Sequence, residues 1–127
     1  MVLPDLVGMV VHDMASSLRF YRLLGLDLPA HADMEDHVEF VTPGGFRIAW
    51  DGEAMIKSIY PDWVEPVGQR IGLAFKCDNP AEVNTIYDDL IQNGYTGYKA
   101  PWDAFWGQRY AVVLDPDGNH VELFAAL

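Results

Sequence analysis

Glu122 is the side chain best placed to do chemistry, because a clear β-hairpin pattern predicts the direction in which it points. Residues 106–127 alternate with a period of two on either side of the turn Asp115-Pro116-Asp117-Gly118. Proline presets φ in that turn, aspartates hydrogen-bond the local backbone and glycine tolerates positive φ. Val121 and Leu123 then continue the apolar face, with His120 and Glu122 opposite. Glu122 is therefore expected to be a carboxylate aimed away from the apolar face.

A second group that suits ligand chemistry is aromatic. Trp102, Phe105 and Trp106 lie within five positions, beside Asp103, and Trp50 adds another indole in the first half of the chain. Such rings stack on planar or cationic ligands. The alternative is a hydrophobic clamp or a contact between two copies of the chain, since interfaces also use aromatic anchors.

The amino-acid composition limits the classes of molecule that this protein is expected to bind. The 127 residues carry 19 acidic and 8 basic side chains, a formal charge of −11, which disfavours nucleic acid and anionic membranes. The same charge attracts a cationic ligand, or serves only as solubility charge. Cys77, the one cysteine, excludes an intramolecular disulfide and fits a reducing compartment. We expect a soluble cytoplasmic protein, because no signal-peptide pattern opens the chain and no apolar run approaches about 18 residues.

The first half predicts strand, helix and three further strands. Residues 6–12 are a short apolar strand, Asp13 can cap a helix over 14–24, and Gly25 ends it. Three candidate strands follow around 26–34, at 37–42 and at 46–50, with Pro43-Gly44-Gly45 as the last turn. Residues 52–69 lack periodicity and are interpreted as a linker, with one helical turn near 54–59.

The second half repeats this order. A strand at 70–77 is followed by a helix that Asn79 caps and that runs to Asn93, and then by strands at 95–100, 109–114 and 119–124. The chain thus reads as one α+β domain, residues 1–127, built from two βαβββ modules at about 4–51 and 70–127.

Together with this duplication, the segments LRFYRLLGL and VVLDPDGNHVEL are similar to those of the vicinal oxygen chelate superfamily. That superfamily includes glyoxalases, bleomycin resistance proteins and extradiol dioxygenases. The resemblance implies two βαβββ modules whose curved mixed sheets enclose a cavity.

The resemblance also implies where a metal ion would bind, namely on the first and last strands of each module. The matching positions are Leu6, Ala49, Arg70 and Glu122, of which only Glu122 has a suitable donor atom. We therefore expect no metal cofactor at the family site. The remaining route to a divalent metal is an altered set drawn from His31, His37 and Glu39.

Arg70 and Glu122 are expected to point to the same concave side. One possibility is that they form an ion pair at the position of the family's metal ion. The other is that they bind a ligand, Arg70 contacting its carboxylate or phosphate group or Glu122 its amine. Short side chains on the same parity leave space for a pocket: Gly8, Ala49, Gly72, Ala74 and Ala111.

Three functions remain open. The first is a homodimeric, metal-independent protein that sequesters a small cationic or aromatic compound, as bleomycin resistance proteins do in antibiotic resistance. The second is a glyoxalase- or lyase-like enzyme with an altered metal site or with Glu122 as the catalytic acid/base. The third is a structural or regulatory dimer. The predicted ligand-binding residues are Leu6, Ala49, Trp50, Arg70, Trp102, Phe105, Trp106 and Glu122.

Overall fold

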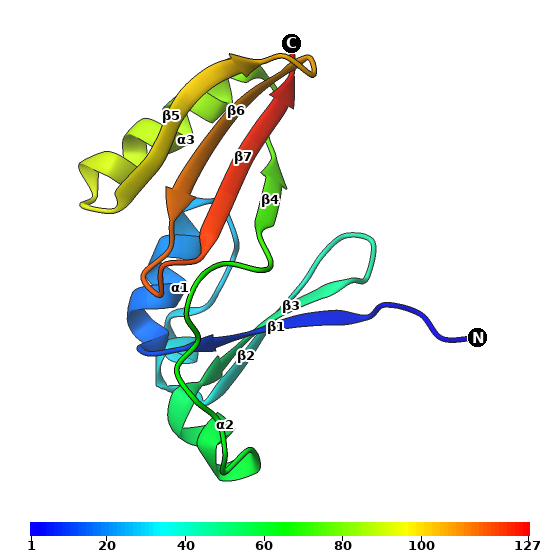
Figure 1. The fold of residues 1–127 in the computed structure, drawn as a ribbon, viewed down its shortest axis with the longest axis vertical. Helices are drawn as coiled ribbons and strands as arrows, with labels where there is room; N and C mark the ends of the chain where they lie inside the picture. The colour runs from blue at the N-terminus through cyan, green and yellow to red at the C-terminus, as the bar shows by residue number, and fades with distance from the viewer. The chain divides into compact units, whose positions relative to one another are not determined.

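The computed structural model describes residues 1–127, which divide into two compact units, Met1–Pro66 and Val67–Leu127 (Figure 1). Each unit has its own sheet, one of three strands and one of four, and both sheets are open. Mixed helices and strands in two sheets confirm the predicted α+β class. No helix has the length and apolar character needed to cross a bilayer.

Unit 1 contains three strands. Its elements are β1 (Leu6–Val11), α1 (Met14–Leu23), the 3₁₀ helix η1 (Ala30–Met34), β2 (His37–Val41), β3 (Arg47–Gly52) and α2 (Glu53–Ile59). The strands are ordered β1-β3-β2, with β1 parallel and β2 antiparallel to β3. As predicted, Asp13 caps α1, its side chain accepting from the backbone N–H of Ser16 at 3.0 Å. The helical turn expected near 54–59 is the C-terminal part of α2.

The strand expected around 26–34 does not exist. Arg22, near the end of α1, donates from Nε to the carbonyl of Leu28 at 2.8 Å and from Nη2 to that of Pro29 at 2.9 Å. It also pairs with Asp33 at 2.8 Å. These carbonyls are satisfied by a guanidinium instead of a neighbouring strand, and the chain continues as η1. The first module is therefore βαββ, not βαβββ.

Unit 2 is a complete βαβββ module. It comprises β4 (Leu73–Lys76), α3 (Pro80–Gln92), β5 (Thr96–Ala104), β6 (Gln108–Leu114) and β7 (His120–Ala126), with strand order β4-β7-β6-β5. Strand β4 runs parallel to β7, whereas β6 is antiparallel to both its neighbours. Asn79 caps α3 as predicted, its Oδ1 accepting from the N–H of Glu82 at 2.9 Å.

One face of each sheet is covered by a helix and forms the core. In unit 1, α1 packs against β3, where the ring of Tyr21 meets that of Trp50 at 5.2 Å between centroids. In unit 2, α3 contacts β5, β6 and β7 (Figure 1). The residues buried on that side of β6 and β7 are Ala111, Val113, Val121, Leu123 and Ala125. The opposite face of each sheet, called its open face below, carries the polar and aromatic residues that bear on function.

Candidate functional site

The turn between β6 and β7 fixes the register that positions Glu122. The buried carboxylate of Asp115 accepts from the backbone N–H groups of Asp117 at 3.0 Å and Asn119 at 2.8 Å, and from the Asn119 side chain at 2.9 Å. Gly118 takes a φ of +81°, which only glycine adopts without strain. This confirms the predicted turn. Counting outward from it pairs Glu122 with Val112 on β6.

Glu122 is held by a neighbouring phenol on the open face. The hydroxyl of Tyr110 donates to Glu122 Oε2 at 2.8 Å. Burial of the phenol, and then this carboxylate, raises the pKa of Tyr110 to about 12. Tyr110 thus remains a neutral donor at physiological pH. It fixes one oxygen of Glu122 without neutralising its charge.

Tyr110 also lies at the centre of an aromatic cluster. Its ring centroid is 5.6 Å from that of Trp102, 5.3 Å from that of Trp106 and 6.0 Å from that of Phe124. Trp106 in turn meets Phe105 at 5.0 Å and Trp102 at 6.1 Å, both edge to face. The predicted residues Trp102, Phe105 and Trp106 are therefore brought together. We refer to these three with Tyr110 and Phe124 as the aromatic cluster.

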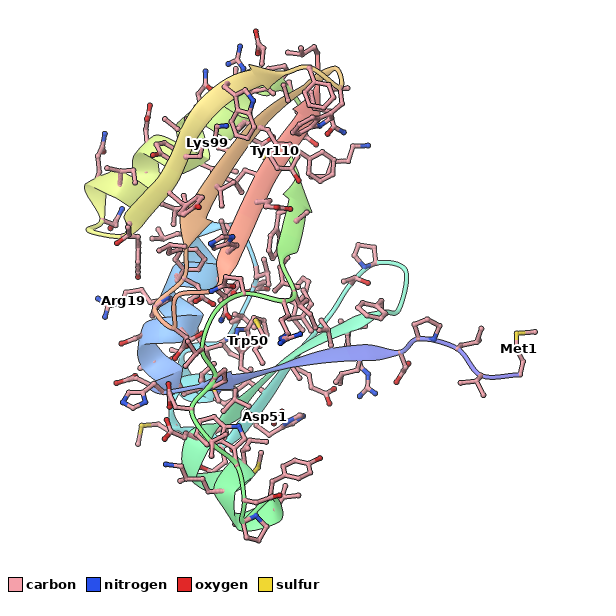
Figure 2. All side chains as sticks on the ribbon, viewed as in Figure 1. Met1, Arg19, Trp50, Asp51, Lys99 and Tyr110 are labelled. Atoms are coloured by element: carbon pink, nitrogen blue, oxygen red, sulfur yellow. The ribbon has the colours of Figure 1, made fainter.

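The aromatic cluster also holds a cation. The ammonium of Lys99 lies 4.0 Å from the centroid of the Trp102 ring. Figure 2 labels Lys99 and Tyr110 on the neighbouring strands β5 and β6. Lys99 is paired with Val112, the residue that also pairs with Glu122. The open face of unit 2 thus carries a cation, indoles, a neutral phenol and a carboxylate.

Beside Glu122 the side chains on β4 and just before it are absent or short. A Cβ added to Gly72 would lie 3.9 Å from both Cδ and Oε1 of Glu122. Ala74, two residues on, pairs with Glu122. The second oxygen of Glu122 therefore borders space that a larger residue at position 72 would fill.

Arg70 does not meet Glu122 as expected. Strand β4 begins at Leu73, so Arg70 precedes the strand, and its side chain is exposed. No ion pair joins it to Glu122. A contact between Arg70 and Glu122 on one face would need a strand that reaches back to residue 70. The chain instead bends at residues 68 and 70, and the strand begins only after Gly72.

The strand register also changes which residue matches Leu6. The first-strand partner of the last-strand ligand position is Gly8 in unit 1 and Ala74 in unit 2. Leu6 lies two residues before Gly8, so its counterpart is Gly72 and not Arg70. A slip of two residues preserves parity along a strand, which is why alternation alone did not reveal it.

Two predicted ligand-binding residues of β3 are buried. Trp50 is 0% exposed and packs on the helix-covered face. Ala49 lies on the open face, paired with Gly8 and Glu39, but is also fully buried. Because consecutive residues of a strand point to opposite faces of the sheet, Ala49 and Trp50 do not line the same face. Leu6 lies on the open face at 39% exposure.

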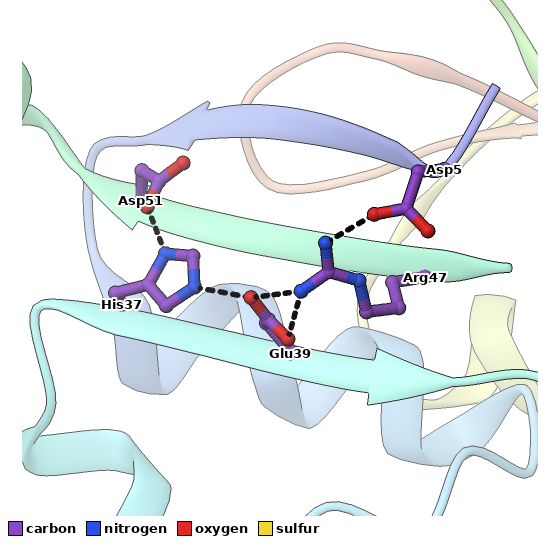
Figure 3. A network of polar contacts seen from close by, with 5 residues as sticks. All are labelled: Asp5, His37, Glu39, Arg47 and Asp51. Atoms are coloured by element: carbon purple, nitrogen blue, oxygen red, sulfur yellow. Dashed lines mark hydrogen bonds and ion pairs between the residues drawn. The ribbon is translucent and has the colours of Figure 1, made fainter. Parts of the chain in front are cut away.

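On the open face of unit 1 the charged residues satisfy one another (Figure 3). Arg47 bridges Asp5 at 2.5 Å and Glu39 at 2.9 Å. The His37 ring bonds Asp51 through Nδ1 and Glu39 through Nε2, the latter at 2.9 Å. The bond to Asp51, then that to Glu39, raises the pKa of His37, while His37 and then Arg47 lower the pKa of Glu39.

The residues at the family's four ligand positions do not fit a metal ion. The first- and last-strand positions supply Leu6 and Ala49 in unit 1, and Gly72 and Glu122 in unit 2. One carboxylate among four positions falls short of the three protein ligands that a catalytic metal ion needs. Of the altered set, His37 has both nitrogens bonded to carboxylates and His31 lies in η1. No three His, Cys, Asp or Glu side chains are grouped so as to hold an ion.

A shallow cavity of about 470 Å³ lies along the edge of β5. Its polar groups are partly paired, since Arg109 donates to Asp103 at 2.5 Å and to Asn84 at 3.0 Å. The lining residues are Asn84, Asp88, Pro101, Trp102, Asp103 and Arg109.

Two α/β units in one chain, each with its first strand parallel to its last, are the architecture of a known class of proteins. The chain belongs to the Glyoxalase/Bleomycin resistance protein/Dioxygenase superfamily, whose sequence profile matches residues 4–123. This confirms the resemblance noted from the sequence. No protein of curated function matches the chain.

Solved structures share this fold. A family enzyme from Burkholderia phytofirmans PsJN superposes with a TM-score of 0.83 at 22% identity, covering 97% of this chain and 98% of its own. A glyoxalase/bleomycin resistance protein/dioxygenase from Nocardioides gives 0.74 at 27% identity, covering 100% and 85%. A glyoxalase-related enzyme from Fulvimarina pelagi gives 0.81 at 18% identity, covering 98% and 88%.

Proposed function

We propose that this protein binds a small cationic, aromatic molecule on the open face of unit 2, without a metal ion. The observation that carries the proposal is the pairing of Glu122 with a neutral tyrosine inside the aromatic cluster. A carboxylate that no cation neutralises, next to several ring faces, suits a ligand with positive charge and a planar group.

Each residue has a defined role in this proposal. Tyr110 holds Oε2 of Glu122, which leaves Oε1 to meet the ligand cation next to Gly72. Trp102 and Trp106, perpendicular to each other at 90°, offer ring surfaces for the planar part and for the positive group. The formal charge of −11 raises the local concentration of cations around the protein.

The test is a titration followed by tryptophan fluorescence with three phenyl probes: phenyltrimethylammonium, benzyl alcohol and benzoate. We expect saturable quenching by the cation, weaker binding of the alcohol, and weakest binding of benzoate. Glu122→Gln should weaken cation binding about 10- to 100-fold, the effect of losing one charged contact. The matched control is Glu39→Gln on the open face of unit 1, for which affinity should stay within about twofold.

Two outcomes would overturn the proposal. One is benzoate binding as tightly as phenyltrimethylammonium, which would show that Glu122 does not select charge. The other is unchanged cation affinity in Glu122→Gln.

An enzyme is the second candidate, because Glu122 is the one proton-accepting side chain among the four family positions. Incubation with an α-oxoaldehyde and a thiol, followed by proton NMR, tests a glyoxalase- or lyase-like activity. Turnover that Glu122→Gln abolishes favours the enzyme, whereas unchanged reactants favour the binding protein.

A contact between two copies is the competing use of the aromatic cluster. Phe105 is 98% exposed and Trp106 is 49% exposed. Sedimentation velocity of the wild type and of Phe105→Ser separates the two uses. A dimer that dissociates in the variant assigns the cluster to subunit contact, and an unchanged sedimentation coefficient leaves it to the ligand.

A further inference from the structure

We propose that Lys99 is an internal occupant of the cation subsite, covering Trp102 until a ligand cation displaces it, and that it thereby sets the affinity and selectivity of the site. This inference rests on the proposed function and deepens it. It names a small organic ammonium ion as the group that meets Trp102.

A local irregularity in β5 brings the two residues together. Residues three apart in a regular strand face opposite sides of the sheet. Here Lys99 pairs with Val112 and Trp102 with Tyr110, so three residues on β5 span two on β6. This register shift, a β-bulge, places both side chains on the open face. Bulges of this kind re-aim side chains and recur next to functional sites.

The ammonium of Lys99 contacts an aromatic ring and not a carboxylate. It lies 4.0 Å from the centroid of the Trp102 indole, the ring that attracts cations most strongly, and it forms no ion pair. The chain has 19 acidic side chains, so carboxylates are abundant. The position of this ammonium marks where a positive group is stable on the open face.

Lys99 is also able to leave. Its side chain is exposed, and an exposed lysine changes rotamer in picoseconds to nanoseconds. A ligand cation that reaches Trp102 must displace it, so the measured affinity includes the loss of the Lys99–Trp102 contact. From the usual strength of such contacts, the cover weakens cation binding by about 2- to 30-fold.

The test uses choline and its neutral isostere 3,3-dimethylbutan-1-ol, followed by the NMR shifts of the tryptophan indole N–H signals. Lys99→Ala should tighten choline binding about 2- to 30-fold, and Lys99→Arg, which restores a cation over the ring, should return it to the wild-type value.

The matched control is Lys76→Ala. Lys76 pairs with Phe124, which puts it on the same open face, but no indole lies beneath it. This variant removes the same charge and should change choline affinity by less than about twofold. The neutral isostere gains no cation–π contact with Trp102, so it should bind more weakly than choline in every variant.

Three results would overturn the inference: equal effects of the two lysine variants on choline, unchanged choline affinity in Lys99→Ala, or no choline shifts in either wild type or Lys99→Ala. Each is separate from the proposed function, which stands or falls on phenyltrimethylammonium binding and Glu122→Gln.

Discussion

The two units share a plan but differ on their open faces. In each, the first strand lies parallel to the last and a capped helix covers one side of the sheet. On the open face of unit 1, Arg47 and His37 lie between the carboxylates of Asp5, Glu39 and Asp51. On the open face of unit 2, the only partner of Glu122 is a neutral phenol.

This difference teaches where ligand chemistry is available. A charge already paired with its neighbours gains little from a ligand, because the ligand must first break those contacts. Glu122, with Tyr110 and the aromatic cluster, keeps an unneutralised charge beside apolar surface. The charges of unit 1 are thus paired within the unit, and unit 2 is the one for which we propose ligand recognition.

The largest expected effect tests the feature that the units share. Leu18 of α1 and Leu90 of α3 are both 0% exposed. Leu18→Ala and Leu90→Ala should each lower the free energy of unfolding by about 2–5 kcal/mol, and by similar amounts, because both leave a cavity under the covering helix. Urea unfolding measures this. A loss below about 1 kcal/mol in either variant would show that its helix does not cover a true core.

The next prediction concerns the strand that unit 1 lacks. Arg22→Ala should destabilise the protein by about 1–3 kcal/mol, because the carbonyls of Leu28 and Pro29 lose their donor. Amide hydrogen exchange should accelerate over residues 26–34. Arg19→Ala, at an exposed position on the same helix and without an ion pair, is the control and should stay within about 0.5 kcal/mol. Unchanged exchange in Arg22→Ala would contradict this account of the missing strand.

The smallest effect is a pH dependence peculiar to unit 1. The pKa of His37 is raised above 6.5 in the folded protein, so folding favours its protonated form. Its contribution to stability is present below pH 6.5 and is lost as pH rises through the raised pKa. The pKa of Glu39 is lowered, so its contribution is lost as pH falls below 4.5.

The measurement is the melting temperature of wild type and His37→Gln from pH 5 to pH 9. The difference between them should be greatest near pH 5.5 and should shrink toward pH 9. A difference that grows with pH would mean that His37 is neutral in the folded state. Glu122→Gln leaves the contacts of His37 in unit 1 intact. In that background, the effect of His37→Gln on the melting temperature should have the same pH dependence.

Local signals predicted most of the fold. The caps Asp13 and Asn79, the turn at 115–118 and the alternation along β6 and β7 each specify geometry within a few residues, and the structure confirms them. The strand predicted around 26–34 is wrong because the carbonyls of this segment bond the side chain of Arg22 on the preceding helix. The period-two pattern of the segment itself does not reveal such a contact.

The proposed site was predicted less completely. The sequence pattern predicts Trp102, Phe105 and Trp106 as ligand-binding residues, but not Tyr110, whose ring meets both indoles and whose hydroxyl bonds Glu122. The signal was present, because a turn centred on 115–118 fixes the pairing outward to Tyr110 and Phe124. Lys99 could not have been found, since the bulge that places it on the open face breaks the period of two.

The buried carboxylate of Asp115 has a consequence for how this surface can change. Because the turn and the buried apolar face fix which side of the sheet each residue of β6 and β7 takes, residues 110 and 124 on the open face carry little of the information that specifies the fold. They can be varied together to recognise other molecules while the strands keep their register. A slip of β7 by one residue against β6 would instead turn Glu122 toward α3 and remove it from the proposed site in a single step.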